Sequence, residues 1–458
     1  PKVTAMARSL GFVPKGMDAA GALELSLSGG VQDGIVDMNK VSGLLTDAQI
    51  SMGQKTIREP RLSLSGSGRA DLPKRSLALG ETRLEFTPGH LTLKSIKVPD
   101  WSNPAAGLTG QFDGTIDTAK LLAQAGDFVS LPRDTQVSGT LEITGDLASR
   151  RTGQEVNVQA GVKPLVVRRA ADDVRVEEDI SVNLAGTVDA DAKSVQARQV
   201  KVQSQSLTMD ATGSLTDWGT TRRVQAKGDL GFDFPRVNEI IKAVADRDLE
   251  LRGNSSGPFT LDVPLGAGKW SKVLEQARAD YQVALEHANV AGVEATEFTV
   301  DIKTDEQGLS ARMTGKANGG TVTLMPRVQF EQGNAFLTLE QEEPILAGLQ
   351  INQAMMNAAL ARTNPLYRRP VDPQGLLGVS VGNLRIPLGA ENPLQEAVGS
   401  ADLSCGKVSY GSRGVLSDLL QGVDLGDARV RLTDQQMGLK LADGRLQQER
   451  MSFMVDKY

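Results

Sequence analysis

The sequence predicts a mostly β protein, an elongated antiparallel meander built from repeats of about 118 residues with one short helix in each repeat. Three observations predict it. Segments recur at a fixed spacing, apolar residues alternate with polar ones along most of the chain, and tight-turn dipeptides separate the alternating runs. Glycine is also frequent, with 48 residues among 458, above the usual share of about 7%, which indicates many turns rather than long helices.

The repeat is visible at several positions in one register. The segment that begins at Gly21 returns in degenerate form at Gly139, Gly257 and Gly375, and each step is 118 residues. The alternating pair that begins at Leu62 returns at the same spacing as Ile180 and Val182, and again as Phe298 and Val300. The chain therefore divides into four partial copies: residues 1–115, truncated at the N-terminal helix, residues 116–231, residues 232–348, and residues 349–458, which form a C-terminal domain that ends inside an apparent strand.

A short helix is expected in each repeat, after Asp117 and after Asp233. Aspartate is a favoured N-cap, and Pro235 suits the first turn. A weaker match places a third helix after Leu349, and a helix is also expected in the C-terminal domain around residues 415–420. The second helix has apolar residues at the spacing i, i+3, i+4, i+7: Val237, Ile240, Ile241 and Val244.

Nearly all of the remaining chain alternates with period two, which predicts strands with one apolar and one polar face. Clear examples are Leu62/Leu64, Leu84/Phe86, Leu91/Leu93, Ile180/Val182/Leu184, Leu207/Met209/Ala211 and Met437/Leu439/Leu441. Four dipeptides predict tight hairpin turns because they tolerate positive φ angles: Asp33-Gly34, Asp113-Gly114, Asn318-Gly319 and Asp443-Gly444. The mixed-charge run 168–179 is interpreted as an exposed hairpin.

Composition argues against several classes of function. The net charge is −6 and no basic block exceeds a pair or so, which disfavours a nucleic-acid partner. Cys405 is the single cysteine, and His90 and His287 lie far apart, so we expect neither a metal site nor a cofactor. No catalytic constellation emerges, and we expect no enzyme. No window approaches the roughly 18 apolar residues of a membrane span, so any anchor or export signal is expected outside this chain.

A sheet of this length with one apolar face must pack that face against other protein or against an apolar ligand. A closed barrel, a sandwich, or an open curled sheet that holds a greasy ligand would each satisfy the alternation. The repeat favours an elongated ribbon, because such a ribbon grows by adding units. About thirty strands at roughly 4.8 Å would extend on the order of 140 Å, which exceeds the 40 Å or so of a bilayer.

The repeated unit resembles the AsmA-like family of bacterial envelope proteins. The clearest instance runs from Asp117 through Leu131-Pro132 to Gly139-Thr140-Leu141-Glu142-Ile143. The C-terminal runs 427–432 and 439–446 resemble the strand, turn and strand near the end of that family's C-terminal domain. The resemblance spans most of the chain.

The resemblance implies a fold and a function. The fold would be a long β-groove, open and lined by apolar side chains. The function would be non-enzymatic transport of phospholipid between the inner and outer membranes, in the periplasm, by a protein held to the inner membrane through an anchor outside this chain. The residues expected to line the groove are Leu62, Leu64, Leu141, Ile143, Ile180, Val182, Leu184, Phe259, Leu261, Phe298, Val300, Ile302, Val430 and Leu432.

Two alternatives stay open. One is a structural or assembly factor for outer-membrane proteins that binds unfolded chains through its strand edges. The other is a β-solenoid that binds or acts on polysaccharides, which should present aromatic platforms. With three Trp and four Tyr in the whole chain, the second alternative is weak.

Overall fold

The computed structural model forms two compact units. Unit 1 comprises Pro1–Arg222 with Glu239–Arg247, and unit 2 comprises Arg223–Asn238 with Asp248–Tyr458. The structure describes residues 17–52, 55–102, 107–125, 135–150, 153–169, 174–189, 192–217, 222–245, 250–265, 273, 275–290, 292–305, 308–331, 334–357, 370–388, 393, 395–412 and 430–455. These residues contain 27 strands, and the fold is mostly β, as the alternation predicts.

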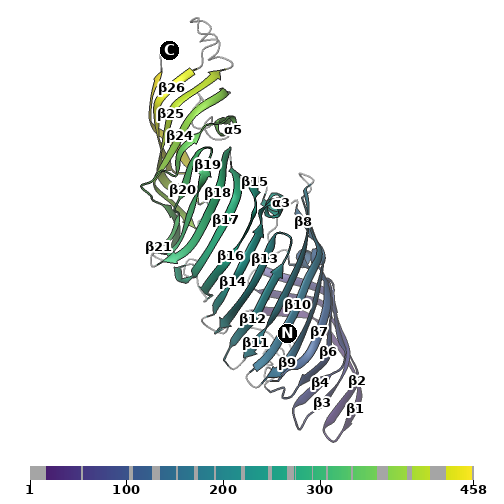
Figure 1. Cartoon of the computed structure of the whole chain (residues 1–458). Coiled ribbons are helices and arrows are strands. Elements are labelled where there is room, and N and C mark those ends of the chain that lie inside the picture. Colours follow the sequence, from purple (N-terminus) through teal and green to yellow (C-terminus); the bar gives the residue numbers. More distant parts are fainter. Residues whose placement is uncertain are drawn as a thin grey trace. The chain divides into compact units, whose positions relative to one another are not determined.

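In the described residues, unit 1 is an antiparallel meander (Figure 1). The short helix α2 (Thr118–Gln124) follows its seventh strand. Most of its strands pair with the strands that precede and follow them in the chain. Its strands are β1 (Met17–Gln32), β2 (Ile35–Met52), β3 (Lys55–Asp71), β4 (Ser76–Leu79), β5 (Thr82–Phe86), β6 (Gly89–Val98), β7 (Thr109–Asp117), β8 (Thr135–Ser138), β9 (Thr140–Arg150), β10 (Gly153–Arg169), β11 (Val174–Asp189), β12 (Ser194–Gln203) and β13 (Leu207–Thr216).

Unit 2 repeats this plan. The helix α3 (Phe234–Ala245) follows the first strand of the unit, and its residues from Glu239 onward are counted with unit 1. The one-turn helix α5 (Gln353–Met355) follows a later strand of unit 2. Its strands are β14 (Arg223–Asp233), β15 (Glu250–Arg252), β16 (Asn254–Pro264), β17 (Arg278–Val290), β18 (Val293–Asp305), β19 (Gly308–Ala317), β20 (Gly320–Leu324), β21 (Arg327–Glu331), β22 (Asn334–Leu339), β23 (Leu346–Gln350), β24 (Pro370–Leu388), β25 (Val398–Ser412), β26 (Val430–Ala442) and β27 (Arg445–Val455).

The hairpin turns follow the sequence in three of the four predicted places. Asp33-Gly34, Asn318-Gly319 and Asp443-Gly444 have positive φ at both residues and join β1 to β2, β19 to β20 and β26 to β27. The fourth prediction is wrong, because Asp113-Gly114 lies inside β7. There the glycine serves close packing: a Cβ on Gly114 would lie 2.5 Å from the carbonyl oxygen of His90 on β6.

The chain enters α2, α3 and α5 through the same hydrogen bond, so the repeat is visible in the structure as well as in the sequence. The first backbone N–H after the preceding strand donates to the carbonyl of a glycine at the start of the next part of the sheet. The three pairs are Thr118 with Gly139 at 3.0 Å, Phe234 with Gly253 at 3.2 Å, and Ile351 with Gly375 at 3.0 Å. The structural counterpart of Gly139 in the third repeat is therefore Gly253, four residues before the Gly257 that the sequence spacing suggests.

The N-caps of the helices follow the expectation. Asp117 accepts the backbone N–H of Lys120, and Asp233 accepts that of Arg236, each at 3.1 Å. The boundaries of the four repeats stay predictions. The helix expected around residues 415–420 lies outside the described residues.

A carboxylate clamp also recurs, in β3 and β11. Glu59 accepts both the backbone N–H and the hydroxyl of Thr87, at 3.1 and 2.6 Å. Glu178 accepts the same two groups of Ser206, at 2.7 and 2.6 Å. Both members are shifted by 119 residues, from 59 to 178 and from 87 to 206, so the clamp belongs to the repeat. Glu178 is buried, although it lies in the mixed-charge run that the sequence assigns to an exposed hairpin.

Bulges interrupt the strand registers and curl the sheet. Asp47, Ser95, Glu297 and Lys407 have φ between 51° and 53° and lie at breaks in the pairing of β2, β6, β18 and β25. A bulge increases the local twist and bends its strand. In unit 1 the early strands pass behind the later ones (Figure 1).

Candidate functional site

The apolar residues of unit 1 form continuous rows across the sheet, because directly paired residues share one face. The longest row crosses nine strands from β3 to β13. Its members are Leu64, Leu84, Leu91, Gly114, Ile143, Ala160, Val182, Val202 and Met209. A parallel row contains Leu93, Phe112, Gly145, Val158, Leu184, Val200 and Ala211. A third contains Ile116, Leu141, Val162 and Ile180.

This apolar face is only half-buried. Along β9 and β13 most polar side chains are exposed, while most of the alternating apolar side chains between them have intermediate exposure. Among the described Ala, Val, Ile, Leu, Met and Phe residues up to residue 222, the buried ones are Ala48, Ile96, Val176 and Ala211. Within the described part of unit 1, the inner face of the sheet therefore lacks the close packing that a sandwich layer would give it.

The structure brings the seven predicted groove residues of unit 1 onto this face. They occupy the three rows or the adjoining pair of Leu62 with Leu45, and all are half-buried. The seven are Leu62, Leu64, Leu141, Ile143, Ile180, Val182 and Leu184.

Unit 2 has equivalent rows. One runs through Gly228, Phe259, Tyr281, Ile302 and Ala311, and another through Val283, Val300, Met313 and Leu324. The predicted residues Phe259, Leu261, Phe298, Val300 and Ile302 are all half-buried. The last two predicted residues, Val430 and Leu432, lie in β26, but their side chains are outside the described part of the chain.

Sequence reasoning missed several members of the rows. Phe112 lies between Gly110 and Gly114, so no simple period marks it. Val158 and Val202 do alternate with polar residues, in the runs Val156/Val158/Ala160 and Val200/Val202. The alternation of apolar and polar residues also marks Leu84, Leu91 and Met209, since each belongs to an alternating pair named above. Extending every alternating run across its neighbours would have found them.

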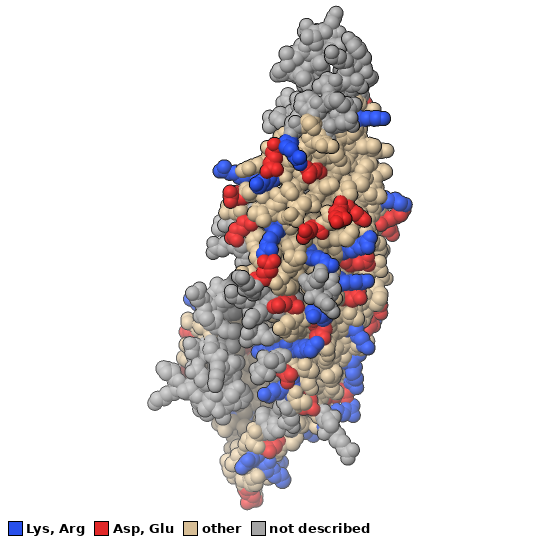
Figure 2. All heavy atoms as spheres, turned by 90° about the vertical axis from the view of Figure 1, so that its left-hand side faces the viewer, with Lys and Arg blue, Asp and Glu red and all other residues tan. Residues whose placement is uncertain are grey.

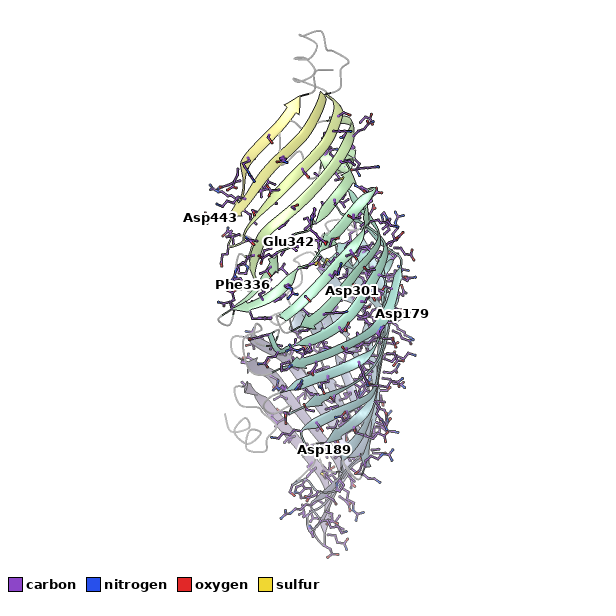
Figure 3. All side chains as sticks on the ribbon, turned by 60° about the vertical axis from the view of Figure 1, so that its left-hand side comes forward. Asp179, Asp189, Asp301, Phe336, Glu342 and Asp443 are labelled. Atoms are coloured by element: carbon purple, nitrogen blue, oxygen red, sulfur yellow. The ribbon has the colours of Figure 1, made fainter. Side chains whose placement is uncertain are left out.

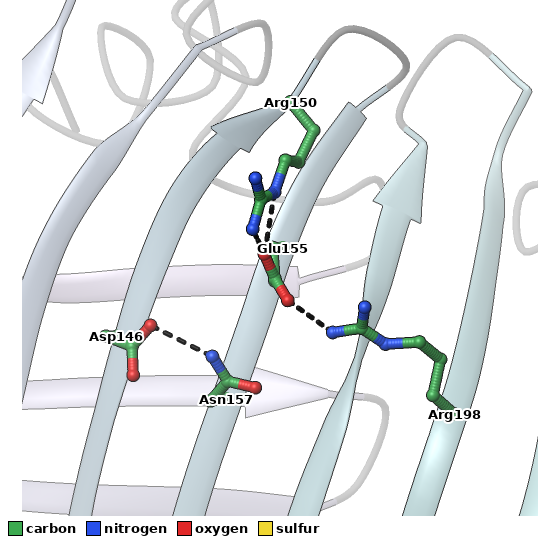
Figure 4. Close-up of polar contacts among 5 residues, drawn as sticks. All are labelled: Asp146, Arg150, Glu155, Asn157 and Arg198. Atoms are coloured by element: carbon green, nitrogen blue, oxygen red, sulfur yellow. Dashed lines mark hydrogen bonds and ion pairs between the residues drawn. The ribbon is translucent and has the colours of Figure 1, made fainter.

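The opposite face of the sheet is polar and charged. Acidic and basic side chains are intermixed over the face seen in Figure 2, and side chains such as Asp179 and Asp301 project from the strands in Figure 3. A representative cluster joins Glu155 to Arg150 and Arg198, which approach its two carboxylate oxygens (Figure 4). Hydrogen bonds from Arg198 and then Arg150 lower the pKa of Glu155. These charged side chains favour exposure of this face of the sheet to solvent.

The repeated clamp holds the carboxylates of Glu59 and Glu178 at positions that are partly or fully shielded from solvent. Burial alone would raise the pKa of Glu178, but the hydroxyls of Ser204 and Ser206 and nearby backbone N–H groups lower it below the usual value. Glu59 follows the same pattern, with hydrogen bonds from Thr87 and from Gln124 of α2. These carboxylates are tied to backbone and side-chain donors of the fold, and we assign them a structural role.

Residues with possible chemical roles have ordinary surroundings. Cys405 is buried in the core of unit 2, as expected for a small apolar residue. His90 lies opposite Thr115 in the β6–β7 ladder, and His287 lies opposite Thr296. Within the described ranges, no group of three or more His, Cys, Asp or Glu residues is placed to hold a metal ion. No helix in those ranges is both long and apolar enough to cross a bilayer.

The two terminal strands of the described chain differ in character. On β1 the side chains of Leu25, Leu27 and Val31 are 70%, 60% and 73% exposed. On β27 the exposed stretch 445–450 is rich in charge and amide groups. Charged residues protect a strand edge from unwanted pairing, whereas exposed apolar side chains invite contact.

The comparisons with known proteins do not identify a family. The sequence matches no family model, and no match is found among the curated proteins or the solved structures.

Proposed function

We propose that this protein binds the acyl chains of phospholipids along its apolar face and conducts them between the inner and outer membranes of a bacterial envelope. The observation that carries the proposal is the continuous row of half-buried apolar residues in unit 1. A sheet that needed only a core would cover such a row with a second layer. A half-buried side chain of Val or Leu size leaves about 1 kcal/mol of transfer free energy available to a bound ligand.

The dimensions of the face fit an acyl chain. The row from Leu64 to Met209 makes eight steps between strands, which corresponds to about 38 Å at roughly 4.8 Å per step. One leaflet of a bilayer has a hydrocarbon depth of about 15 Å, half of the usual 30 Å core. The row is therefore long enough for a chain to move along it. Headgroups would stay in water, and no side chain would need to react.

The cellular setting follows from the resemblance to the AsmA-like family. The protein would work in the periplasm, anchored to the inner membrane. Its partners would be phospholipid and the two membranes.

The test is native mass spectrometry with lipid extraction on the protein purified from bacterial cells. The variant carries Val182→Asp and Val300→Asp, which place charge on the apolar faces of the two units. The control carries Asn183→Asp and Gln282→Asp, which place the same charge on the polar face. We expect phospholipid with the wild type and the control, and none with a folded apolar-face variant. Wild-type protein free of lipid, or equal lipid in both variants, contradicts the proposal.

A second candidate function is favoured by the exposed leucines of β1. An assembly factor for outer-membrane proteins would pair an incoming strand with this apolar edge. The test is binding of a peptide from an outer-membrane strand to the wild type and to Leu25→Lys with Leu27→Lys. Loss of binding in the variant supports this function, and equal binding excludes β1 as the site.

A further inference from the structure

The apolar face of unit 2 changes character near α5, where it becomes fully covered. Met355 and Met356 are 2% and 0% exposed, and Leu349 and Ile351 beside them are 0% and 5% exposed. The cluster under the two methionines comprises Ala295, Ala317, Val322, Leu377, Cys405 and Val408. The face that is half-buried at Val300 is therefore sealed at this end by residues 351–356 of the same chain.

The covering segment is short and is held by a few side-chain hydrogen bonds. The amides of Asn352 and Asn318 both donate to the carbonyl of Gly292, at 2.8 and 3.0 Å. Asn352 also caps α5 by accepting the backbone N–H of Met355 at 2.8 Å. Only glycine fits at the anchor, because a Cβ on Gly292 would lie 2.5 Å from the backbone nitrogen of Met355. A single helical turn is not stable in isolation, so these contacts and the two methionines hold the segment in place.

The equivalent helix of unit 1 does not seal its sheet. α2 starts with the same hydrogen bond to a glycine carbonyl, yet none of its residues is buried, and Leu121 remains 38% exposed. The cluster beneath α5, which we call the floor, also differs from the apolar rows in unit 1, because three of its residues are small: Ala295, Ala317 and Cys405. Small residues leave room for the methionines.

We propose that residues 351–356 are a displaceable plug and that the small-residue floor beneath them is a further acyl-chain site. The inference rests on the proposed function and adds where acyl chains bind in unit 2. A methionine side chain is unbranched and flexible, so the shape that fills the site resembles a run of methylene groups. An acyl chain that advances along the face of unit 2 displaces the plug and replaces its contacts with similar ones. The covered state and the lipid-filled state are two occupancies of one site.

The test uses a phospholipid that carries a diazirine at the end of one acyl chain. The lipid is bound to the full-length protein and photolysed, and peptide mass spectrometry locates the labelled residues. We expect label at Ala317, Leu377 or Cys405 in addition to the face around Val300. Asn352→Ala removes the cap and one anchor of the plug. Loss of a cap of about 1 kcal/mol predicts about a fivefold rise in label on the floor.

Gln353→Ala is the matched control. Gln353 lies on the same turn and is exposed, and its side-chain amide donates to Asn357 rather than to the residues that anchor the plug, so its variant should label as the wild type does. If the wild type and Asn352→Ala are both labelled around Val300 but not on the floor, the plug is overturned. The proposed function is not contradicted by that result. Equal increases in both variants also overturn the plug. Protein that takes up no lipid at all refutes the proposed function and the plug together.

Discussion

Replacing Gly139 with alanine should destabilise unit 1 strongly. Gly139 has a φ of 156°, and a Cβ there would lie 2.6 Å from the carbonyl oxygen of Pro164 and 2.8 Å from Cγ1 of Val162. Its own carbonyl accepts the N–H and the hydroxyl of Thr118, so the backbone cannot rotate freely to relieve the clash. A residue forced into a conformation reserved for glycine costs about 1–3 kcal/mol, and with the backbone contact we expect a loss of about 3 kcal/mol.

The assay is urea unfolding of the wild type, Gly139→Ala and the control Gly161→Ala. Gly161 lies in the neighbouring strand β10, where a Cβ would make only a 3.4 Å contact with the carbonyl of Ile180. Alanine there should be neutral or stabilise by up to about 0.5–1 kcal/mol, because glycine is unfavourable inside a strand. For a urea m value of about 3 kcal/mol/M, Gly139→Ala should lower the midpoint of unit 1 by about 1 M. Equal midpoints for the two variants would refute the role given to the repeated glycine.

Three further predictions concern burial and charge. Because the folded pKa of Glu178 is lowered, its carboxylate stabilises the fold above the unfolded pKa of a glutamate, about 4.3, and this stabilisation is lost as the pH falls. Glu178→Gln should cost about 2 kcal/mol at pH 7, and unfolding measured as a function of pH should show that difference vanish in acid. In lipid-free protein, Leu349→Ala should cost about 2–5 kcal/mol and half-buried Ile143→Ala about 1 kcal/mol in thermal unfolding; equal costs would contradict an uncovered face in unit 1. Leu25→Ser with Leu27→Ser should leave stability within about 0.5 kcal/mol and reduce self-association in sedimentation; an unchanged sedimentation profile would count against an adhesive β1 edge.

Much of the architecture could be predicted because it depends on local patterns. Alternation fixes which face of a strand is apolar, so Leu141 and Ile143 fall on the inner face as expected. An Asx-Gly pair such as Asn318-Gly319 marks a hairpin through its own backbone preference. An aspartate before an apolar period marks a helix start, as at Asp233.

The features that escaped prediction depend on partners distant in sequence. Asp113-Gly114 has the composition of a turn, but neighbouring strands hold it in an extended ladder. Glu178 looks like part of a solvated charge run, and only the fold brings Ser206 to it. The sealing of the face by Met355 and Met356 has no local signature, because it depends on which strands lie beneath them.

The order of strand pairing has a consequence for how the protein is made. Most strands pair with the strand that leaves the ribosome or a secretion channel just before them, as β10 does with β9 and β11. The contacts that form the sheet are therefore close in sequence, which favours rapid zipping of one hairpin after another. Each new hairpin adds to an existing edge, so the chain can fold in order of its emergence without waiting for its C-terminus.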